Sequence, residues 1–138
     1  ALDASRLFAT QLRHALNGED KHIILVGHRA RVSAPAIVEI AKGDVASWEA
    51  GHIRGSGYVV ESLRAALWCF ATTDSFEQAV LKAANLGDDA DTTAAICGQL
   101  AGAYYGVQGI PAAWREQVAM AGLINALSDQ LYQQALQG

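Results

Sequence analysis

The apolar residues of this chain recur at helical spacing. The clearest example is a set three, four and three positions apart: Val60, Leu63, Leu67 and Phe70. Residues at these intervals share one face of an α-helix, whereas a half-buried strand needs apolar residues at every second position. No convincing alternating run occurs anywhere in the sequence. The spacing therefore predicts an all-α protein.

Turn and capping residues indicate where the other helices begin and end. We expect helices at a stripe of Phe8, Leu12 and Leu16, at 19–26, at 35–40, from Phe76 to about 85–87, and from Pro111 through Leu131. The segment 19–26 has too few apolar residues to separate a buried helical turn from a strand by periodicity, and helix is favoured. Residues 43–57 form a Gly-rich connection that is irregular or functional, and Ser56 is a candidate cap for the helix that follows.

A row of small residues dominates the segment that follows the acidic cluster near residue 90. The row has helical i+4 spacing: Ala94, Gly98, Gly102 and Gly106. Glycine inside a helix costs about 0.5–1 kcal/mol relative to alanine, so close packing against neighbours is expected in return. The row predicts a central helix that is packed on all sides.

Composition excludes several classes of protein. The chain has 138 residues, of which 51% are hydrophobic and 17% charged, so we expect a single domain over residues 1–138. No apolar run approaches the 20 or so residues of a membrane span, and the N-terminus lacks the features of a signal peptide. The net charge of −4 without a dense basic block argues against binding nucleic acid or an anionic membrane. Cys69 and Cys97 have no metal-binding spacing and are expected to be free thiols, which favours a cytoplasmic location.

Three carboxylates fall within four positions, at Asp88, Asp89 and Asp91. One interpretation is helix capping, because acidic groups are stabilising at a helix N-terminus, and this would account for Asp91 alone. The other interpretation is a metal site, because Asp89 and Asp91 with the hydroxyl of Thr92 offer hard oxygen ligands suited to Mg²⁺, Mn²⁺ or Ca²⁺. The spacing alone leaves both open.

The segment "GDDADTTAAICGQLAGAYYG", followed shortly by "IP", resembles the C-terminal signature of the ADP-ribosylglycohydrolases, such as those of the dinitrogenase reductase-activating type. Upstream, "GSGYVVESLRAALWCF", "SFEQAV" and "ALDASRLFATQLRHALNGED" are similar to preceding segments of the same family. The resemblance thus covers nearly the whole chain. It implies a compact orthogonal bundle of helices that holds two divalent cations, usually Mg²⁺ or Mn²⁺.

The resemblance also implies roles for individual residues. Asp89, Asp91 and Thr92 match the C-terminal metal-ligand motif, while Gly57 and Tyr58 fall in a segment that lines the ADP-ribose cleft. Backbone N–H groups at such a helix start are free to meet a phosphate or ribose oxygen. The four histidines receive no role, and Gly27 to Arg31 is interpreted as a solvated turn.

The chain departs from the family pattern because the N-terminal acidic motifs have no counterpart. It resembles the C-terminal part only, as a remnant of a longer chain, an engineered piece or one chain of a split protein. We therefore expect the catalytic residues to lie in the absent N-terminal half, and metal affinity to be reduced. We also expect an exposed apolar face that favours self-association or pairing with that half.

Two classes of function follow. The first is the C-terminal part of a metal-dependent hydrolase, which cleaves the glycosidic bond between ADP-ribose and a protein side chain or in a related ADP-ribosyl compound. The second is a non-catalytic helical module that keeps the fold for a structural or interaction role.

Overall fold

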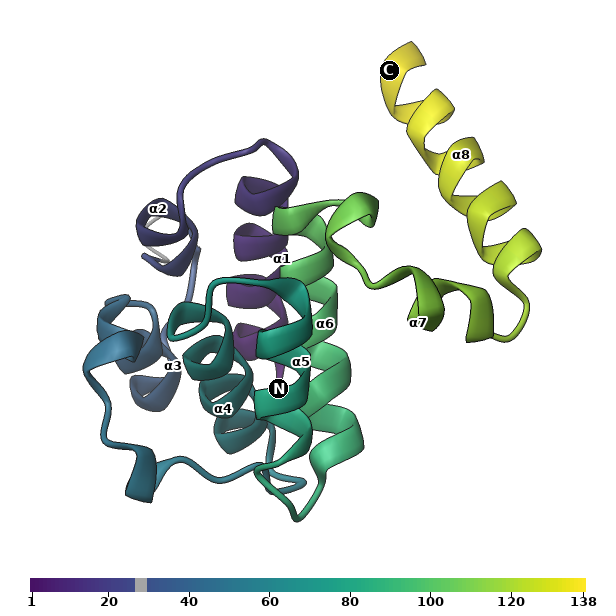
Figure 1. The fold of residues 1–138 in the computed structure, drawn as a ribbon. Helices are drawn as coiled ribbons and strands as arrows, with labels where there is room; N and C mark the ends of the chain where they lie inside the picture. Colours follow the sequence, from purple (N-terminus) through teal and green to yellow (C-terminus); the bar gives the residue numbers. More distant parts are fainter. Residues whose placement is uncertain (27–29) are drawn as a thin grey trace.

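A computed structural model describes residues 1–26 and 30–138 (Figure 1). Its helices, including short 3-10 turns labelled η, are in chain order α1 (Leu2–Leu16), α2 (Lys21–Leu25), α3 (Pro35–Ile40), η1 (Asp44–Ser47), η2 (Ala50–His52), α4 (Val59–Ala71), α5 (Phe76–Ala84), α6 (Ala90–Tyr105), η3 (Val107–Gly109), α7 (Ala112–Gln117) and α8 (Ala121–Gln137). No strand occurs in these described residues, so the all-α prediction is confirmed. The turn predicted at Gly27 to Arg31 lies largely outside them.

Helix α4 supplies most of the core. Eight of its side chains are buried, ending with a continuous run from Ala65 to Phe70. It packs between α5 and α6 on one side and α2, α3 and η1 on the other, while α1 packs against α6 (Figure 1). The apolar stripe predicted from the sequence lies on this helix, and burial extends well around it.

The half-buried Lys21 joins the start of α2 to the end of α4. Its Nζ donates to the carbonyl oxygens of Phe70 at 2.7 Å and Thr73 at 2.5 Å, and lies 4.5 Å from the centre of the Phe70 ring. A cation at this position satisfies carbonyls that a helix end leaves without partners and complements the helix dipole. Burial lowers the pKa of Lys21, and the neighbouring Asp74 carboxylate partly opposes that shift.

The helix predicted from the stripe of Phe8, Leu12 and Leu16 is confirmed as α1, but the buried face of this helix is rotated away from that stripe. The buried residues are Ala4, Leu7, Gln11, His14 and Ala15, while Phe8 and Leu12 are half-buried and Leu16 is 73% exposed. The buried face includes two polar side chains that have specific partners: His14 Nδ1 lies 2.8 Å from Glu19 Oε2, and Gln11 Nε2 donates to Leu25 O at 3.4 Å. Polar residues with partners inside the fold do not appear in a hydrophobic pattern.

The small-residue row of α6 packs against one neighbour, not on all sides. A β-carbon at Gly98 would lie 3.6 Å from Val80 Cγ2, and one at Gly102 would lie 3.8 Å from Phe76 Cε2, both atoms of α5. Gly106, at φ +74°, ends the helix. The opposite side of α6 is exposed at Asp91, Ala95 and Gln99, so the prediction of a helix surrounded by protein is wrong.

The C-terminal helix predicted from Pro111 to Leu131 is two helices. Met120 adopts φ +58°, in the left-handed region, and separates α7 from α8. The apolar spacing in the sequence continues across Met120. Such spacing indicates which residues share a helix face, but it cannot indicate that one residue has a positive φ angle.

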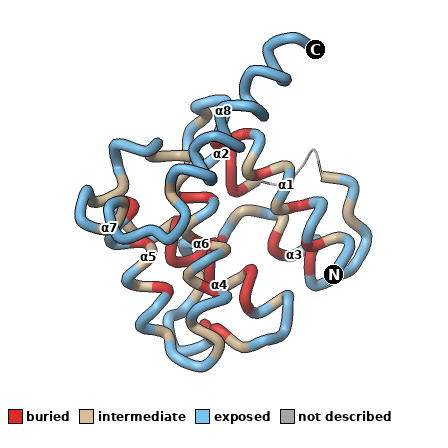
Figure 2. The backbone as a smooth tube through the Cα atoms, turned by 90° about the vertical axis from the view of Figure 1, so that its right-hand side faces the viewer, coloured by how far each residue is buried: buried red, intermediate tan, exposed pale blue. Residues whose placement is uncertain are grey.

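Helix α8 projects from the bundle, and none of its side chains is buried (Figures 1 and 2). Its exposed apolar residues include Leu123, Ile124, Leu127 and Leu131. The exposed apolar face expected from the sequence is therefore present on this helix. Within the part of the chain that the structure describes, no helix is both long and apolar enough to cross a membrane.

Candidate functional site

The acidic turn, Asp88 to Asp91, lies where the chain enters α6. Asp88 is exposed in the left-handed region at φ +53°, Asp89 is the N-cap residue, and Asp91 lies in the first turn. The capping interpretation had assigned the cap to Asp91, and the structure assigns that position to Asp89. The Asp89 side chain makes no capping hydrogen bond to the backbone, so its carboxylate is available for another role.

The oxygen atoms of this turn face one another. Thr92 Oγ1 donates to Asp89 Oδ1 at 2.9 Å. The pKa of the Asp91 carboxyl lies below its usual range, first because of hydrogen bonding with the Asp89 carboxyl and then because of the backbone N–H groups of Thr92 and Asp91. Asp89, Asp91 and Thr92, which the sequence nominated as metal ligands, are thus neighbours in space.

The Gly-rich loop, residues 55–58, lies against the acidic turn. The Asp89 N–H donates to the carbonyl oxygen of Gly55 at 2.7 Å. A β-carbon at Gly57 would lie 3.6 Å from Asp89 Oδ2. The two segments that the sequence singled out separately therefore form one site.

Tyr58 lies at the edge of this site as the N-cap residue of α4, with 61% of its surface exposed. Its backbone N–H donates to Ser56 Oγ at 3.2 Å, and the Ser56 hydroxyl donates to Glu61 Oε2. Ser56 was predicted to be the cap, but it lies two positions earlier and bonds to the capping residue. The N–H of Tyr58 is consequently not free for a ligand, whereas its phenol is accessible beside a pocket of about 460 Å³ that Asp3 and Pro35 also line.

The donor atoms fit a hard divalent cation in kind. Carboxylate and hydroxyl oxygens are the ligands that Mg²⁺ and Mn²⁺ prefer. Among the described residues, no group of three or more His, Cys, Asp or Glu side chains could hold a metal ion. Two carboxylates and one hydroxyl are therefore a partial set, which water or groups outside this chain would have to complete.

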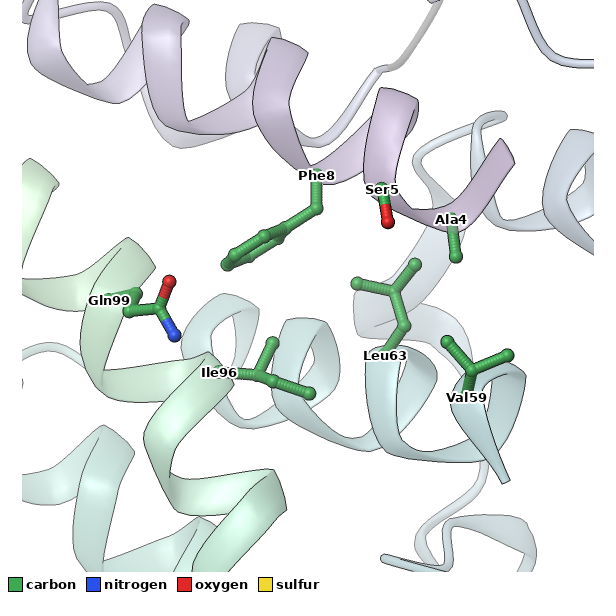
Figure 3. A pocket seen from close by; sticks show the side chains of 7 residues that line it. All are labelled: Ala4, Ser5, Phe8, Val59, Leu63, Ile96 and Gln99. Atoms are coloured by element: carbon green, nitrogen blue, oxygen red, sulfur yellow. The ribbon is translucent and has the colours of Figure 1, made fainter. Parts of the chain in front are cut away.

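A separate apolar pocket of about 240 Å³ opens between α1, α4 and α6 (Figure 3). The side chains of Phe8, Leu63 and Ile96 point toward this pocket. Val59, which follows Tyr58 in the chain, also lines it. Ser5 and Gln99 add polar atoms to its lining, which includes no His, Cys, Asp or Glu side chain among the described residues. Its lining suits an apolar side chain better than a phosphate or a sugar.

Sequence reasoning missed two residues of the site, Gly55 and Thr93. Thr93 is fully buried, and its Oγ1 donates to Asp89 O at 3.1 Å. Gly55 is also buried and lies against Thr93. A glycine in a Gly-Ser-Gly loop and a threonine in a helix are common, so neither residue carries a signal until the two segments are seen together.

The match to a known family covers the whole chain: the family model described as ADP-ribosylglycohydrolase matches residues 1–138. The chain belongs to the ADP-ribosylglycohydrolase family. A Pseudomonas putida protein named ADP-ribosylarginine hydrolase Tri1 is 44% identical over 137 residues, covering 99% of this chain and 37% of that protein. A Serratia proteamaculans protein of the same name is 38% identical over 124 residues, covering 90% of this chain and 34% of that protein.

The fold of this ADP-ribosylglycohydrolase chain also matches a solved structure. An ADP-ribosylglycohydrolase-related protein complex aligns with a TM-score of 0.86 at 40% identity, covering 96% of this chain and 47% of that chain. The resemblance noted in the sequence is therefore confirmed. The chain spans less than half the length of the proteins that it matches.

Proposed function

We propose that this chain forms part of a metal-dependent hydrolase that cleaves the glycosidic bond between ADP-ribose and a protein side chain. The observation that carries the proposal is the contact of the Gly-rich loop with the acidic turn, where Gly57 lies against the Asp89 carboxylate. A hydrolase of this kind needs its sugar-phosphate contacts and its hard oxygen ligands side by side. The relatives named for ADP-ribosylarginine favour an arginine-linked substrate.

Each residue of the site has a defined part in this proposal. Asp89 and Asp91 supply carboxylate oxygens, and Thr92 holds one Asp89 oxygen through its hydroxyl. Gly57 lets a ligand approach the backbone closely, since it has no side chain. Tyr58 presents an exposed phenol to the same ligand. The groups that act on the scissile bond are expected from outside this chain.

Mg²⁺ or Mn²⁺ is the proposed cofactor. When bound, it would orient the ribose hydroxyls and a water molecule for attack at the anomeric carbon. Asp89 and Asp91 are neighbouring carboxylates, and their like charges repel each other. A divalent cation would offset that repulsion.

We further propose that α8 and the apolar pocket of Figure 3 pair with the remainder of the family fold, and that the chain self-associates without it. The relatives contain in one protein both a segment like this chain and a longer additional segment. A cytoplasmic location is part of the same proposal, because the described thiols Cys69 and Cys97 are free, as a reducing compartment favours.

A non-catalytic helical module remains the second candidate. The partial set of ligands in the described residues favours it for the chain on its own. The two candidates differ in whether the Asp89 carboxylate is needed for hydrolysis.

A hybrid protein tests the proposal. This chain would replace the matching 37% of the Pseudomonas putida relative, and release of ADP-ribose from ADP-ribosylarginine would be measured with Mg²⁺ or Mn²⁺. We expect the hybrid to be active and Asp89→Asn or Asp91→Asn to abolish turnover, because each removes a charged ligand.

The matched control is Asp88→Asn, which alters the exposed neighbour and should leave most of the activity. Full activity in the Asp89→Asn hybrid would exclude the proposed role of this carboxylate and support the non-catalytic module.

A further inference from the structure

The Gly-rich loop and the acidic turn are joined at one point, which we call the Gly55–Thr93 clasp. It consists of the Asp89 N–H donating to Gly55 O at 2.7 Å and Thr93 Oγ1 donating to Asp89 O at 3.1 Å. Gly55 and Thr93 are both buried, so water does not compete for these bonds. Both hydrogen bonds end on the main chain of Asp89, whose side chain is the candidate ligand.

The clasp depends on glycine at position 55. A β-carbon there would lie 2.7 Å from Thr93 Oγ1, closer than real side chains approach. Thr93 cannot turn away easily, because a β-branched side chain has few rotamers and its hydroxyl is already bonded to Asp89 O. The next nearest atoms, Thr93 Cβ at 3.4 Å and Gly87 O at 3.5 Å, are at ordinary contact distance. The Thr93 hydroxyl is therefore the atom that most obstructs an alanine at position 55.

We propose that Gly55 and Thr93 are positioning residues that hold the Asp89 carboxylate against the loop carrying Gly57 and Tyr58. Both residues are buried, so we assign neither of them a contact with the ligand. This inference rests on the proposed function in assigning ligand contacts to Asp89, Gly57 and Tyr58. The clasp itself is a property of the chain and can be tested without metal or substrate.

The reason to expect a functional consequence is geometric. A displacement of about 1 Å at a reacting group can cost on the order of 100-fold in rate. Residues of a Gly-rich loop have many accessible conformations, so the loop needs a fixed anchor to keep one of them. Loss of the clasp would therefore separate two halves of one site while leaving the bundle folded.

The test compares four variants of this chain by NMR. Gly55→Ala introduces the clash, Gly55→Ala with Thr93→Ala removes the obstructing hydroxyl, and Gly55→Ala with Thr93→Val restores an obstructing group of the same shape. Gly51→Ala is the matched control in the same connection, since a β-carbon there meets nothing within 4 Å. The readouts are hydrogen exchange of the Asp89 amide and its through-space cross-peak to the Gly55–Ser56 backbone.

We expect Gly55→Ala to exchange the Asp89 amide at least about tenfold faster than the unsubstituted chain and to lose the cross-peak. The double variant Gly55→Ala, Thr93→Ala should recover the cross-peak. The double variant Gly55→Ala, Thr93→Val should behave like Gly55→Ala. The Gly51→Ala control should behave like the unsubstituted chain. Rescue by Thr93→Ala but not by Thr93→Val would show that the group in the position of the Thr93 hydroxyl obstructs a β-carbon at position 55.

Wild-type exchange in Gly55→Ala would overturn the inference, as would failure of Thr93→Ala to rescue it. If Gly55→Ala does not fold, a folded double variant with Thr93→Ala supports the clasp and an unfolded one overturns it. Adding Mn²⁺ separates this inference from the proposed function. Absence of line broadening at Asp89 to Thr92 in the hybrid protein would count against the metal site, and the exchange data on the chain would still decide the clasp.

Discussion

At the scale of single residues, the environment of each side chain separates groups that the sequence treats alike. The sequence does not distinguish the three aspartates near residue 90. In the structure, Asp88 is exposed in a left-handed turn, Asp89 is an N-cap residue whose backbone N–H is bonded to Gly55, and the pKa of Asp91 is lowered. Asp89 accepts a hydrogen bond from the Thr92 hydroxyl and lies against the Gly-rich loop, and Asp91 lies beside Asp89. The acidic cluster therefore consists of the pair Asp89 and Asp91, with Asp88 outside the site.

The two cysteines provide a prediction at the same scale. Burial raises the pKa of Cys69 to about 11 and that of Cys97 to about 12. Because the thiolate is the reactive form, we expect both thiols to react with a disulfide reagent at pH 8 at least about 100-fold more slowly than in unfolded protein.

The same shifts give the sign of a pH effect. A thiol whose pKa is raised by folding stabilises the native state fully below the unfolded pKa of about 8.5, and this contribution is lost as pH rises toward 11. Thermal melts should therefore show falling stability above about pH 8.5. Rapid native-state labelling of either cysteine would contradict the burial of these groups.

At the scale of elements, the register of α1 shows what hydrophobic spacing leaves out. The stripe of Phe8, Leu12 and Leu16 has good helical spacing, yet the face that contacts the bundle is centred on Leu7 and His14. The buried histidine and glutamine have partners on other segments, which a local pattern cannot contain. Helix α4 was predicted correctly because apolar residues at the expected spacing make up its buried side, with Ser62 as a buried polar exception.

The two registers predict opposite results for two leucines. Leu7→Ala should cost about 2–5 kcal/mol of unfolding free energy, because Leu7 is completely buried and its removal leaves a cavity. Leu16→Ala should change stability by less than about 0.5 kcal/mol, because Leu16 is 73% exposed. Denaturant unfolding of both variants measures the difference, and a larger loss at Leu16 would restore the register predicted from the sequence.

At the scale of the whole molecule, the features that could be predicted from the sequence are those that depend on residues close together in the chain. Ser75 directly precedes the helix predicted from Phe76, and it caps α5 by accepting from the Gln78 N–H at 3.1 Å. The bond between Asp89 and Gly55 and the break at Met120 were not predictable in this way. The first joins segments distant in sequence, and the second leaves the apolar spacing unchanged.

Helix α8 gives a prediction about association. Its residues Leu127 and Leu131 are 51% and 68% exposed and lie on one face, so the chain should self-associate with rising concentration in sedimentation experiments. Replacing both with glutamine should shift the chain toward monomer. Leu136→Gln is the control, since Leu136 is 64% exposed but lies on the opposite face. A chain that stays monomeric and soluble at high concentration would contradict this expectation.

We propose that the Asp89 and Asp91 carboxylates bind a divalent cation, and electron paramagnetic resonance of Mn²⁺ in the hybrid protein tests this binding most directly. We predict that Asp89→Asn raises the Mn²⁺ dissociation constant at least about tenfold, while Asp88→Asn leaves it within about twofold. Equal Mn²⁺ affinity in the Asp89→Asn and unsubstituted hybrids would contradict the claim.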